Sequence, residues 1–200
     1  MSKILCLDLE GVLAPEIWIE FANKTGLSLL KRTTRDEPDY NKLMRFRLQI
    51  LRENGFKLAD IQKVIATLKP LPGAINFVRK AQAEYQVVIL SDTFYEFAQP
   101  IMKQLGYPML LCNFLEVSKT GFITKHRMRQ KDGKAKAVRA FKKLGLVVHA
   151  AGDSYNDLSM LGEADHGVLF RPPSSIIKSH KQFTVTKTHP ELWKQLIAQA

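Results

Sequence analysis

The chain has 200 residues and a formal net charge of +11 at neutral pH, with 46% hydrophobic and 24% charged residues. This length suits one domain, or one domain with a modest insertion, and the composition excludes a disordered chain. No apolar run reaches the roughly 20 residues that cross a bilayer, and the N-terminus lacks a secretory pattern, so we expect a cytoplasmic protein without a membrane partner.

The first predicted element is a buried strand, and a purely helical segment follows it. The apolar run Lys3–Leu7 predicts the strand. Three helical patterns then follow without a convincing strand, over Pro15–Gly26, Pro38–Glu53 and Leu58–Leu68. We therefore predict a helical cap over residues 14–72, inserted into a core formed by residues 1–13 and 73–200.

After the helical segment, strands and helices alternate. Further strands are predicted at Val87–Leu90, Met109–Cys112, Val147–Ala151 and Gly167–Phe170. Helices are predicted at Pro72–Tyr85, Phe94–Leu105, Lys134–Leu144 and Asp157–Gly162, and a hairpin at residues 113–128 with its turn at Lys119–Gly121. We expect Pro100 to kink its helix. This alternation predicts an α/β, Rossmann-like parallel sheet.

The two cysteines and the excess of basic residues give weaker signals. Cys6 and Cys112 lie in apolar runs, and we interpret them as buried hydrophobic residues. The basic residues are densest between Lys125 and Lys136, which indicates a solvated face or attraction of phosphorylated small molecules. We find no nucleic-acid-binding motif and expect no nucleic-acid partner. A catalytically inactive nucleic-acid-binding protein is the alternative of a different class.

Acidic and small polar residues follow three of the predicted strands. These residues are Asp8 and Glu10, Ser91 and Asp92, and Asp153 and Asp157. The carboxyl ends of parallel strands form the ligand-binding edge of an open α/β sheet, so these side chains are expected to converge. Neighbouring carboxylates repel one another, and a divalent cation with oxygen ligands, most naturally Mg²⁺, removes that repulsion.

The spacing of these residues suggests separate chemical roles. Asp8 and Glu10 are two residues apart, which puts them on one side if the strand conformation continues. Asp8 would attack phosphorus as a nucleophile, and Glu10 would act as general acid and base. Gly11 lets the chain turn directly afterwards.

Two further groups could contact a phosphoryl anion. Ser91 either binds it or caps the following helix, while Thr93 and Glu96 have the spacing of a capping box. A lysine near the start of a later helix would supply positive charge, and both Lys131 and Lys134 are candidates.

Together these segments resemble a known family. D-L-E-G-V (8–12), S-D-T (91–93), Lys134 and G-D-S-Y-N-D (152–157) resemble the four motifs of the haloacid dehalogenase superfamily of phosphatases. Nearly the whole chain resembles its bifunctional phosphoserine phosphatase/homoserine phosphotransferase branch. Glu10 stands where the superfamily usually has Asp, so a longer side chain must reach the same oxygen. The second motif lacks the glycines usual in phosphoserine phosphatases.

The resemblance implies a role for each matching residue. Asp8 is the nucleophile and Glu10 the acid/base, while Asp8, the Glu10 backbone carbonyl and Asp153 bind Mg²⁺, with Asp157 contacting the metal through water. Ser91 and Lys134 hold the phosphoryl group. We also count Asp92 and Asn156 among the substrate-binding residues.

The predicted cap offers evidence on the substrate. In the helix Pro38–Glu53, Arg47 falls in the middle of the apolar stripe and Arg45 on the opposite side. A buried arginine needs a partner, either a structural acid or a substrate carboxylate. Glu16, in the first turn of the first cap helix, either stabilises the helix dipole or pairs with a substrate ammonium. By resemblance, this acid and arginine recognise the amino-acid end of a substrate.

We therefore predict Mg²⁺-dependent hydrolysis of O-phospho-L-serine through a phospho-Asp8 intermediate, in L-serine biosynthesis. The sequence leaves two alternatives open. The enzyme could also transfer the phosphoryl group to homoserine, or its substrate could be a different small phosphate ester, such as a sugar or nucleotide phosphate. The sequence also leaves the oligomeric state open, with a homodimer as one option.

Overall fold

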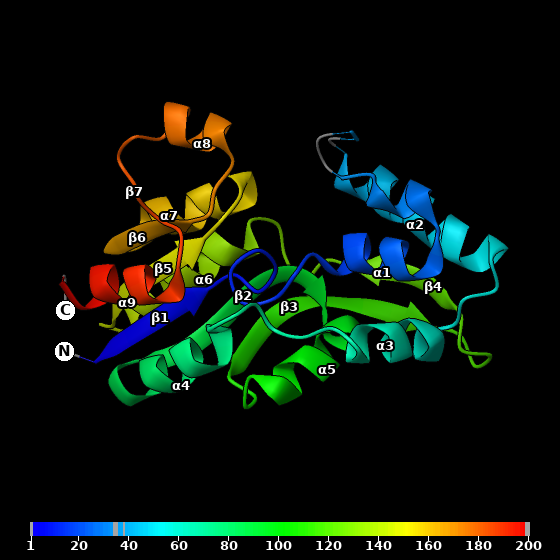
Figure 1. Ribbon diagram of the computed structural model, residues 1–200, viewed down its shortest axis with the longest axis horizontal. Coiled ribbons are helices and arrows are strands. Elements are labelled where there is room, and N and C mark those ends of the chain that lie inside the picture. Colours follow the sequence, from blue (N-terminus) through cyan, green and yellow to red (C-terminus); the bar gives the residue numbers. More distant parts are fainter. Residues whose placement is uncertain (1, 34–35, 38, 199–200) are drawn as a thin grey trace.

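A seven-stranded sheet organises the part of the chain that the computed structural model describes, residues 2–33, 36–37 and 39–198 (Figure 1). The strand order is β4-β3-β2-β1-β5-β6-β7. The strands are β1 (Lys3–Leu7), β2 (Gln86–Phe94), β3 (Met109–Val117), β4 (Ile123–Arg127), β5 (Val147–Gly152), β6 (His166–Phe170) and β7 (Thr184–Thr186). All neighbouring strands are parallel except β3 and β4. The predicted α/β, Rossmann-like sheet is confirmed.

Alternating side chains of the central strand β1 build a hydrophobic core on each face of the sheet. Leu5 and Leu7 belong to one buried cluster, and Ile4 and Cys6 to the other. This period of two is what a strand covered on both faces requires.

Helices cover both faces. On the Leu5 side lie α4 (Ala74–Glu84), α5 (Tyr95–Gln104) and α9 (His189–Ala198). On the Ile4 side lie α6 (Gly133–Lys143), α7 (Leu158–Glu163) and α8 (Ser174–Ser179). None of the helices in the described ranges is long and apolar enough to cross a membrane.

Between β1 and α4 the described residues form helices and no strand. The elements are α1 (Ile17–Thr25), a 3-10 turn η1 (Ser28–Lys31), α2 (Tyr40–Glu53) and α3 (Leu58–Ala66). We call residues 14–72 the helical insertion; its exact boundaries stay a prediction. In Figure 1 it lies at the β4 end of the molecule. Its buried side chains, including Phe21, Met44 and Ile61, continue the core of the Leu5 side.

The second helix of the insertion begins later than predicted. The Asp39 side chain accepts hydrogen bonds from the backbone N–H groups of Asn41 and Lys42, which fixes the start of α2 at Tyr40. The expected start at Pro38 lies outside the described residues.

Other sequence predictions differ at element ends. The predicted strand Met109–Cys112 and the first arm of the hairpin form one strand, β3, which turns back through Gly121 at a φ of +89°. Helix α5 runs through Pro100. The elements α8, β7 and α9 were not predicted; α8 and β7 are too short to show a clear period.

Both connections between the helical insertion and the core meet at one histidine. The Leu71 N–H donates to the Leu13 carbonyl at 2.8 Å, which ties the outgoing and returning chains together. His189 of α9 is buried, with Nε2 2.9 Å from the Val12 carbonyl and Nδ1 3.1 Å from the Pro72 carbonyl. The ring also packs against Phe77 and Phe170.

We predict that His189→Ala lowers the free energy of unfolding by about 2–4 kcal/mol, because it opens a cavity and removes the partner of buried carbonyls. Urea denaturation followed by circular dichroism measures this loss. Lys194→Ala, an exposed position on the same helix, is the control and should change stability by less than about 0.5 kcal/mol. Equal effects of the two changes would contradict the role of His189.

Candidate active site

Three neighbouring strands deliver the predicted acidic residues to one edge of the sheet. Asp8 directly follows β1, Asp153 directly follows β5, and Ser91 and Asp92 lie near the end of β2. These strands are adjacent in the order β2-β1-β5. Ligand atoms of Asp8, Asp153 and Asp157 lie within 4.8 Å of one another. The expected convergence of acids at the strand ends is therefore present.

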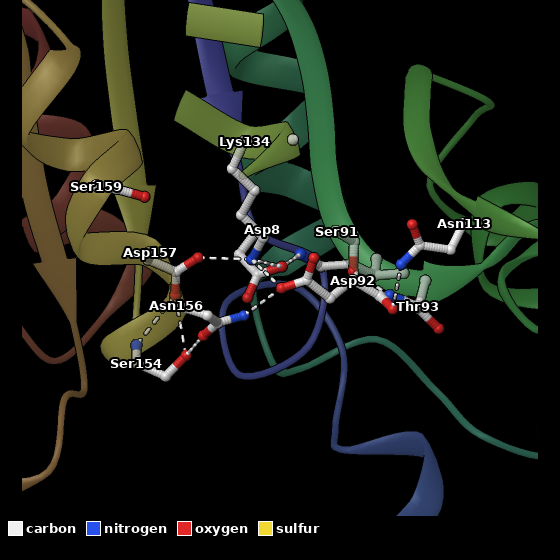
Figure 2. Close-up of polar contacts among 12 residues, drawn as sticks. Asp8, Ser91, Asp92, Thr93, Asn113, Lys134, Ser154, Asn156, Asp157 and Ser159 are labelled. Carbon is white, nitrogen blue, oxygen red and sulfur yellow. Dashed lines mark hydrogen bonds and ion pairs between the residues drawn. The ribbon is translucent and has the colours of Figure 1, made fainter. Parts of the chain in front are cut away.

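A buried lysine lies at the centre of this cluster (Figure 2). Lys134, in the first turn of α6, places its Nζ 2.6 Å from Asp157 Oδ1, 3.0 Å from Asp8 Oδ1 and 4.0 Å from Asp92 Oδ2. Burial alone would lower the pKa of Lys134, but Asp157 and Asp8 raise it well above its ordinary value. Lys131 is exposed, so Lys134 is the lysine that contacts Asp8.

Asp157 organises the loop after β5. Its Oδ1 accepts from Lys134, and its Oδ2 accepts from the backbone N–H groups of Asp153 and Ser154, each at 3.0 Å. Because both oxygens are engaged, this side chain is placed to hold the loop and the lysine. Asn156 of the same loop donates to Asp92 Oδ2 at 2.7 Å and so joins this loop to β2.

Asp153 has the features of a cation ligand. Its Oδ1 is buried and has no hydrogen-bond partner among the residues that the structure describes. Burial and then Asp157 raise the pKa of Asp153 to about 7, and the same two causes raise the pKa of Asp8 well above its ordinary value. A site with this excess of carboxylate oxygen fits a hard divalent cation such as Mg²⁺.

Two glycines allow the chain after β1 and the end of β5 to pack directly against the side chains of Asp153 and Asp157. Gly11 has a φ of +81°, and a Cβ there would lie 2.4 Å from the Asp153 carboxyl carbon. A Cβ at Gly152 would lie 2.4 Å from the Asp157 Cβ. The predicted turn at Gly11 is confirmed, with the further reason that a side chain would occupy the place of a carboxylate.

The S-D-T segment lies in an irregular part of β2, not at the start of a helix. The register between β2 and β3 shifts between Leu90 and Phe94. The alternative that Ser91 caps the following helix is wrong, and so is the capping box suggested by the spacing of Thr93 and Glu96. Phe94 occupies the N-cap position without a side-chain hydrogen bond, and Glu96 accepts instead from the Leu115 N–H.

Glu10 and Glu16 form a second acidic pair at the start of α1. The chain leaves the strand conformation after Leu7, and Glu10 Oε2 accepts from the Ile17 N–H at 3.1 Å. Glu16 occupies the N-cap position just outside the helix, where its side chain makes no capping hydrogen bond. Burial and then Glu16 raise the pKa of Glu10 to about 8. This rise favours the protonated form of Glu10 near neutral pH.

Arg47 is buried on α2, as the apolar stripe predicts. Its guanidinium lies 4.6 Å from the centroid of the Trp18 ring, Nη2 donates to the Arg32 carbonyl at 2.8 Å, and Nε is buried without a partner. Among the described ion pairs, none gives Arg47 a structural acid as its partner. Burial lowers the pKa of Arg47 below its ordinary value, and the nearby Tyr40, Glu10 and Glu16 only partly oppose this lowering.

Two residues of the site, Tyr40 and Asn113, are not among the candidates predicted from the sequence. Tyr40 donates from its hydroxyl to the Asp92 carbonyl at 3.2 Å, and Asn113 donates to the same carbonyl at 2.9 Å. Tyr40 begins a helix and Asn113 lies within an apolar strand, so neither follows a strand end. A polar residue inside the apolar run L-L-C-N-F was the available hint at Asn113.

Comparison with known proteins shows a family and close relatives. Residues 10–162 match the haloacid dehalogenase-like hydrolases. A phosphoserine phosphatase of Pseudomonas syringae pv. tomato is 57% identical over 195 residues, covering 98% of this chain and 82% of that protein. The phosphoserine phosphatase ThrH of Pseudomonas aeruginosa is 56% identical over 195 residues, covering 98% of this chain and 95% of that protein.

Solved structures share the fold. A substrate-bound phosphoserine phosphatase complex superposes with a TM-score of 0.79 at 20% identity, covering 97% of this chain and 98% of that chain. A phospho-aspartyl intermediate analogue of phosphoserine phosphatase superposes with a TM-score of 0.78 at 20% identity, covering 96% of this chain and 98% of that chain.

Replacing Gly11 tests the packing of the strand-end loops. We predict that Gly11→Ala destabilises the protein by about 1–3 kcal/mol, because it combines a left-handed backbone conformation with an overlap on Asp153. It should also weaken Mg²⁺ binding, measured by isothermal titration calorimetry. Gly26→Ala is the control, because Gly26 has a similar φ of +74° with no atom near its missing Cβ. Unchanged Mg²⁺ binding in Gly11→Ala would contradict this account of the loop.

Proposed function

The chain belongs to the haloacid dehalogenase-like hydrolase family, and we propose that it hydrolyses O-phospho-L-serine in a Mg²⁺-dependent reaction. The observation that carries this proposal is the buried group in which Lys134 contacts Asp8 while Asp153 keeps an unpartnered oxygen. The two Pseudomonas relatives named phosphoserine phosphatases support the choice of substrate.

Asp8 is the proposed nucleophile. Its carboxylate is held by the Leu9 N–H at 2.7 Å and by Lys134 at 3.0 Å, so it is oriented before substrate arrives. An Asp8 oxygen would form a bond to phosphorus while the ester P–O bond breaks, leaving a phosphoaspartate and the serine alkoxide. Lys134 would balance the negative charge on the phosphoryl oxygens, and the Ser91 hydroxyl would donate to them.

Glu10 is the proposed acid and base. With a pKa of about 8 its carboxyl holds a proton at neutral pH, which suits transfer to the departing serine oxygen. The resulting carboxylate would then take a proton from water as the water oxygen attacks phosphorus. The Asp8–phosphorus bond breaks, inorganic phosphate leaves, and Asp8 is restored.

A magnesium ion would be held by Asp8, Asp153 and the Glu10 backbone carbonyl. When bound, it would neutralise carboxylate and phosphoryl charge in the site. Asp157 would act outside this set, because its oxygens already bind Lys134 and the loop backbone. Asn156 would keep this loop against Asp92.

The helical insertion would recognise the amino-acid end of the substrate. Arg47 is a buried cation that forms no ion pair with a carboxylate in the described part of the chain, so a substrate carboxylate would complete its contacts. Glu16 lies at the same end of the site, with its carboxyl beside Glu10, and would pair with the substrate ammonium. Closure of the insertion over the substrate would exclude bulk water.

The second half of the reaction leaves room for another acceptor. An alcohol held where the attacking water lies would take the phosphoryl group from Asp8 by the same steps. Homoserine has the carboxylate and ammonium that Arg47 and Glu16 would bind, so we include transfer to homoserine in the proposal. Release of L-serine would suit a role in L-serine biosynthesis.

Phosphate release from O-phospho-L-serine tests the function directly. We expect release that requires Mg²⁺ and stops when the ion is chelated. Asp8→Asn should lower the rate by at least about 10³-fold while the circular dichroism spectrum stays unchanged. Addition of homoserine should yield O-phosphohomoserine, detected by mass spectrometry. Preference for a sugar or nucleotide phosphate in the same panel would replace the proposed substrate.

Arg47 tests recognition of the carboxylate. We predict that Arg47→Ala lowers kcat/KM for phosphoserine about 10- to 100-fold more than for an aryl phosphate that has no carboxylate, since a hydrogen-bonded charge pair is lost. Partial unfolding lowers kcat/KM equally for both substrates, so the ratio of the two kcat/KM values within one variant is free of that effect. Arg45→Ala, on the exposed side of the same helix, should leave that ratio unchanged. An equal loss on both substrates would show that Arg47 does not bind the carboxylate.

A further inference from the structure

Strand β2 carries a bulge where it passes the active site. Leu90 pairs with Leu111 and Phe94 pairs with Asn113, so Ser91, Asp92 and Thr93 all lie opposite Cys112. A bulge leaves backbone groups without their usual ladder partners and often redirects side chains toward a site. The Asp92 carbonyl lies in this bulge and takes its hydrogen bonds from side chains instead.

Two side chains from different parts of the molecule donate to that carbonyl. Asn113 of β3 donates from Nδ2 at 2.9 Å (Figure 2), and Tyr40 of α2 donates from its hydroxyl at 3.2 Å. Asn113 is 4% exposed, and its own Oδ1 accepts from the Arg129 N–H at 2.9 Å. The Asn113 contact therefore belongs to the core, whereas the Tyr40 contact comes from the helical insertion.

Fixing this carbonyl also fixes the N–H group on the other side of the same peptide. The Asp92–Thr93 peptide is planar and trans, so its N–H points opposite to its carbonyl. That N–H donates to Ser91 Oγ at 3.3 Å. Because Oγ then accepts a hydrogen bond, the hydroxyl proton is free to be donated elsewhere.

We infer that Tyr40 and Asn113 are positioning residues that hold the Asp92–Thr93 peptide so that the Ser91 hydroxyl donates to the phosphoryl group. The inference rests on the proposed role of Ser91 in phosphoryl binding. Asn113 supplies a constant contact, and Tyr40 adds its contact only while the helical insertion lies against the core. The position of the insertion is thereby coupled to the phosphoryl pocket through one peptide unit.

A simpler role for Tyr40 would be to hold the insertion closed. The neighbouring residue Asn41 provides the control, because its Oδ1 lies 2.8 Å from His126 Nε2 of β4 and makes a similar contact between insertion and core. Asn41 makes no described hydrogen bond to Asp92. If closure alone mattered, loss of the Asn41 side chain would resemble loss of the Tyr40 hydroxyl.

The test is binding of inorganic phosphate in the presence of Mg²⁺, measured by isothermal titration calorimetry. Tyr40→Phe removes one hydroxyl and keeps the ring, and it should raise the Kd for phosphate about 3- to 10-fold. Asn113→Ala should raise the Kd in the same direction, and Asn41→Ala should leave it within about twofold. Because Tyr40 and Asn113 act on one carbonyl, the double variant should raise the Kd for phosphate by less than the product of the two single fold-changes.

The inference is overturned if Tyr40→Phe binds phosphate as the unchanged protein does, or if Asn41→Ala weakens binding equally. A second readout is turnover of phosphoserine, where Tyr40→Phe should lower kcat as well as kcat/KM. Binding of inorganic phosphate does not require turnover, so this test of the inference does not depend on which phosphate ester is the substrate. Failure of the unchanged protein to hydrolyse phosphoserine would count against the proposed function alone.

Discussion

One buried ammonium group makes the rest of the site possible. Lys134 lies in contact with Asp8 and Asp157, and all three side chains are almost fully buried. Buried carboxylates without a counter-charge would be forced to bind protons, and breaking such a group by removing one partner is strongly destabilising. The lysine thus opposes the rise in the pKa of Asp8 that burial and Asp157 cause, and it holds Asp157 against the loop that carries Asp153.

The parallel sheet explains why residues distant in sequence come together here. Adjacent strands β2, β1 and β5 end at one edge, and α6 begins at the same edge with Lys134 in its first turn. Close approach of the loops then depends on Gly11 and Gly152, where any side chain would occupy the place of Asp153 or Asp157. The parallel strands bring these side chains to the same end of the sheet, and the two glycines allow the loops to pack directly against the carboxylates of Asp153 and Asp157.

Local patterns in the sequence were enough to predict the sheet, the helical insertion and the acids at the strand ends. Each of these predictions follows from the spacing of apolar residues along the chain or from the position of a residue just after a strand, as for Asp8 and Asp153. Capping by Ser91 and the capping box of Thr93 and Glu96 fail for a tertiary reason. A bulge against β3 keeps Ser91 and Thr93 in β2, and the Glu96 carboxylate, in the first turn of α5, accepts a hydrogen bond from the Leu115 N–H of β3. Tyr40 and Asn113 could not be found this way, since their common partner is a backbone carbonyl that carries no sequence signal.

The charges of the site also indicate what must complete it. The carboxylates of Asp8, Asp153 and Asp157, together with that of Asp92 at 4.0 Å from Lys134 Nζ, outnumber this one lysine, so the site has an excess of carboxylate that suits a divalent cation. Without that cation, burial and mutual repulsion raise the pKa values of Asp8 and Asp153. In the proposed mechanism a protonated Asp8 would be a poor nucleophile, so cation binding and activation of Asp8 would be parts of one electrostatic balance. In the proposed mechanism Arg47 follows the same logic at the other end of the site, where a buried cation without an ion pair among the described residues would take an anionic group from the substrate.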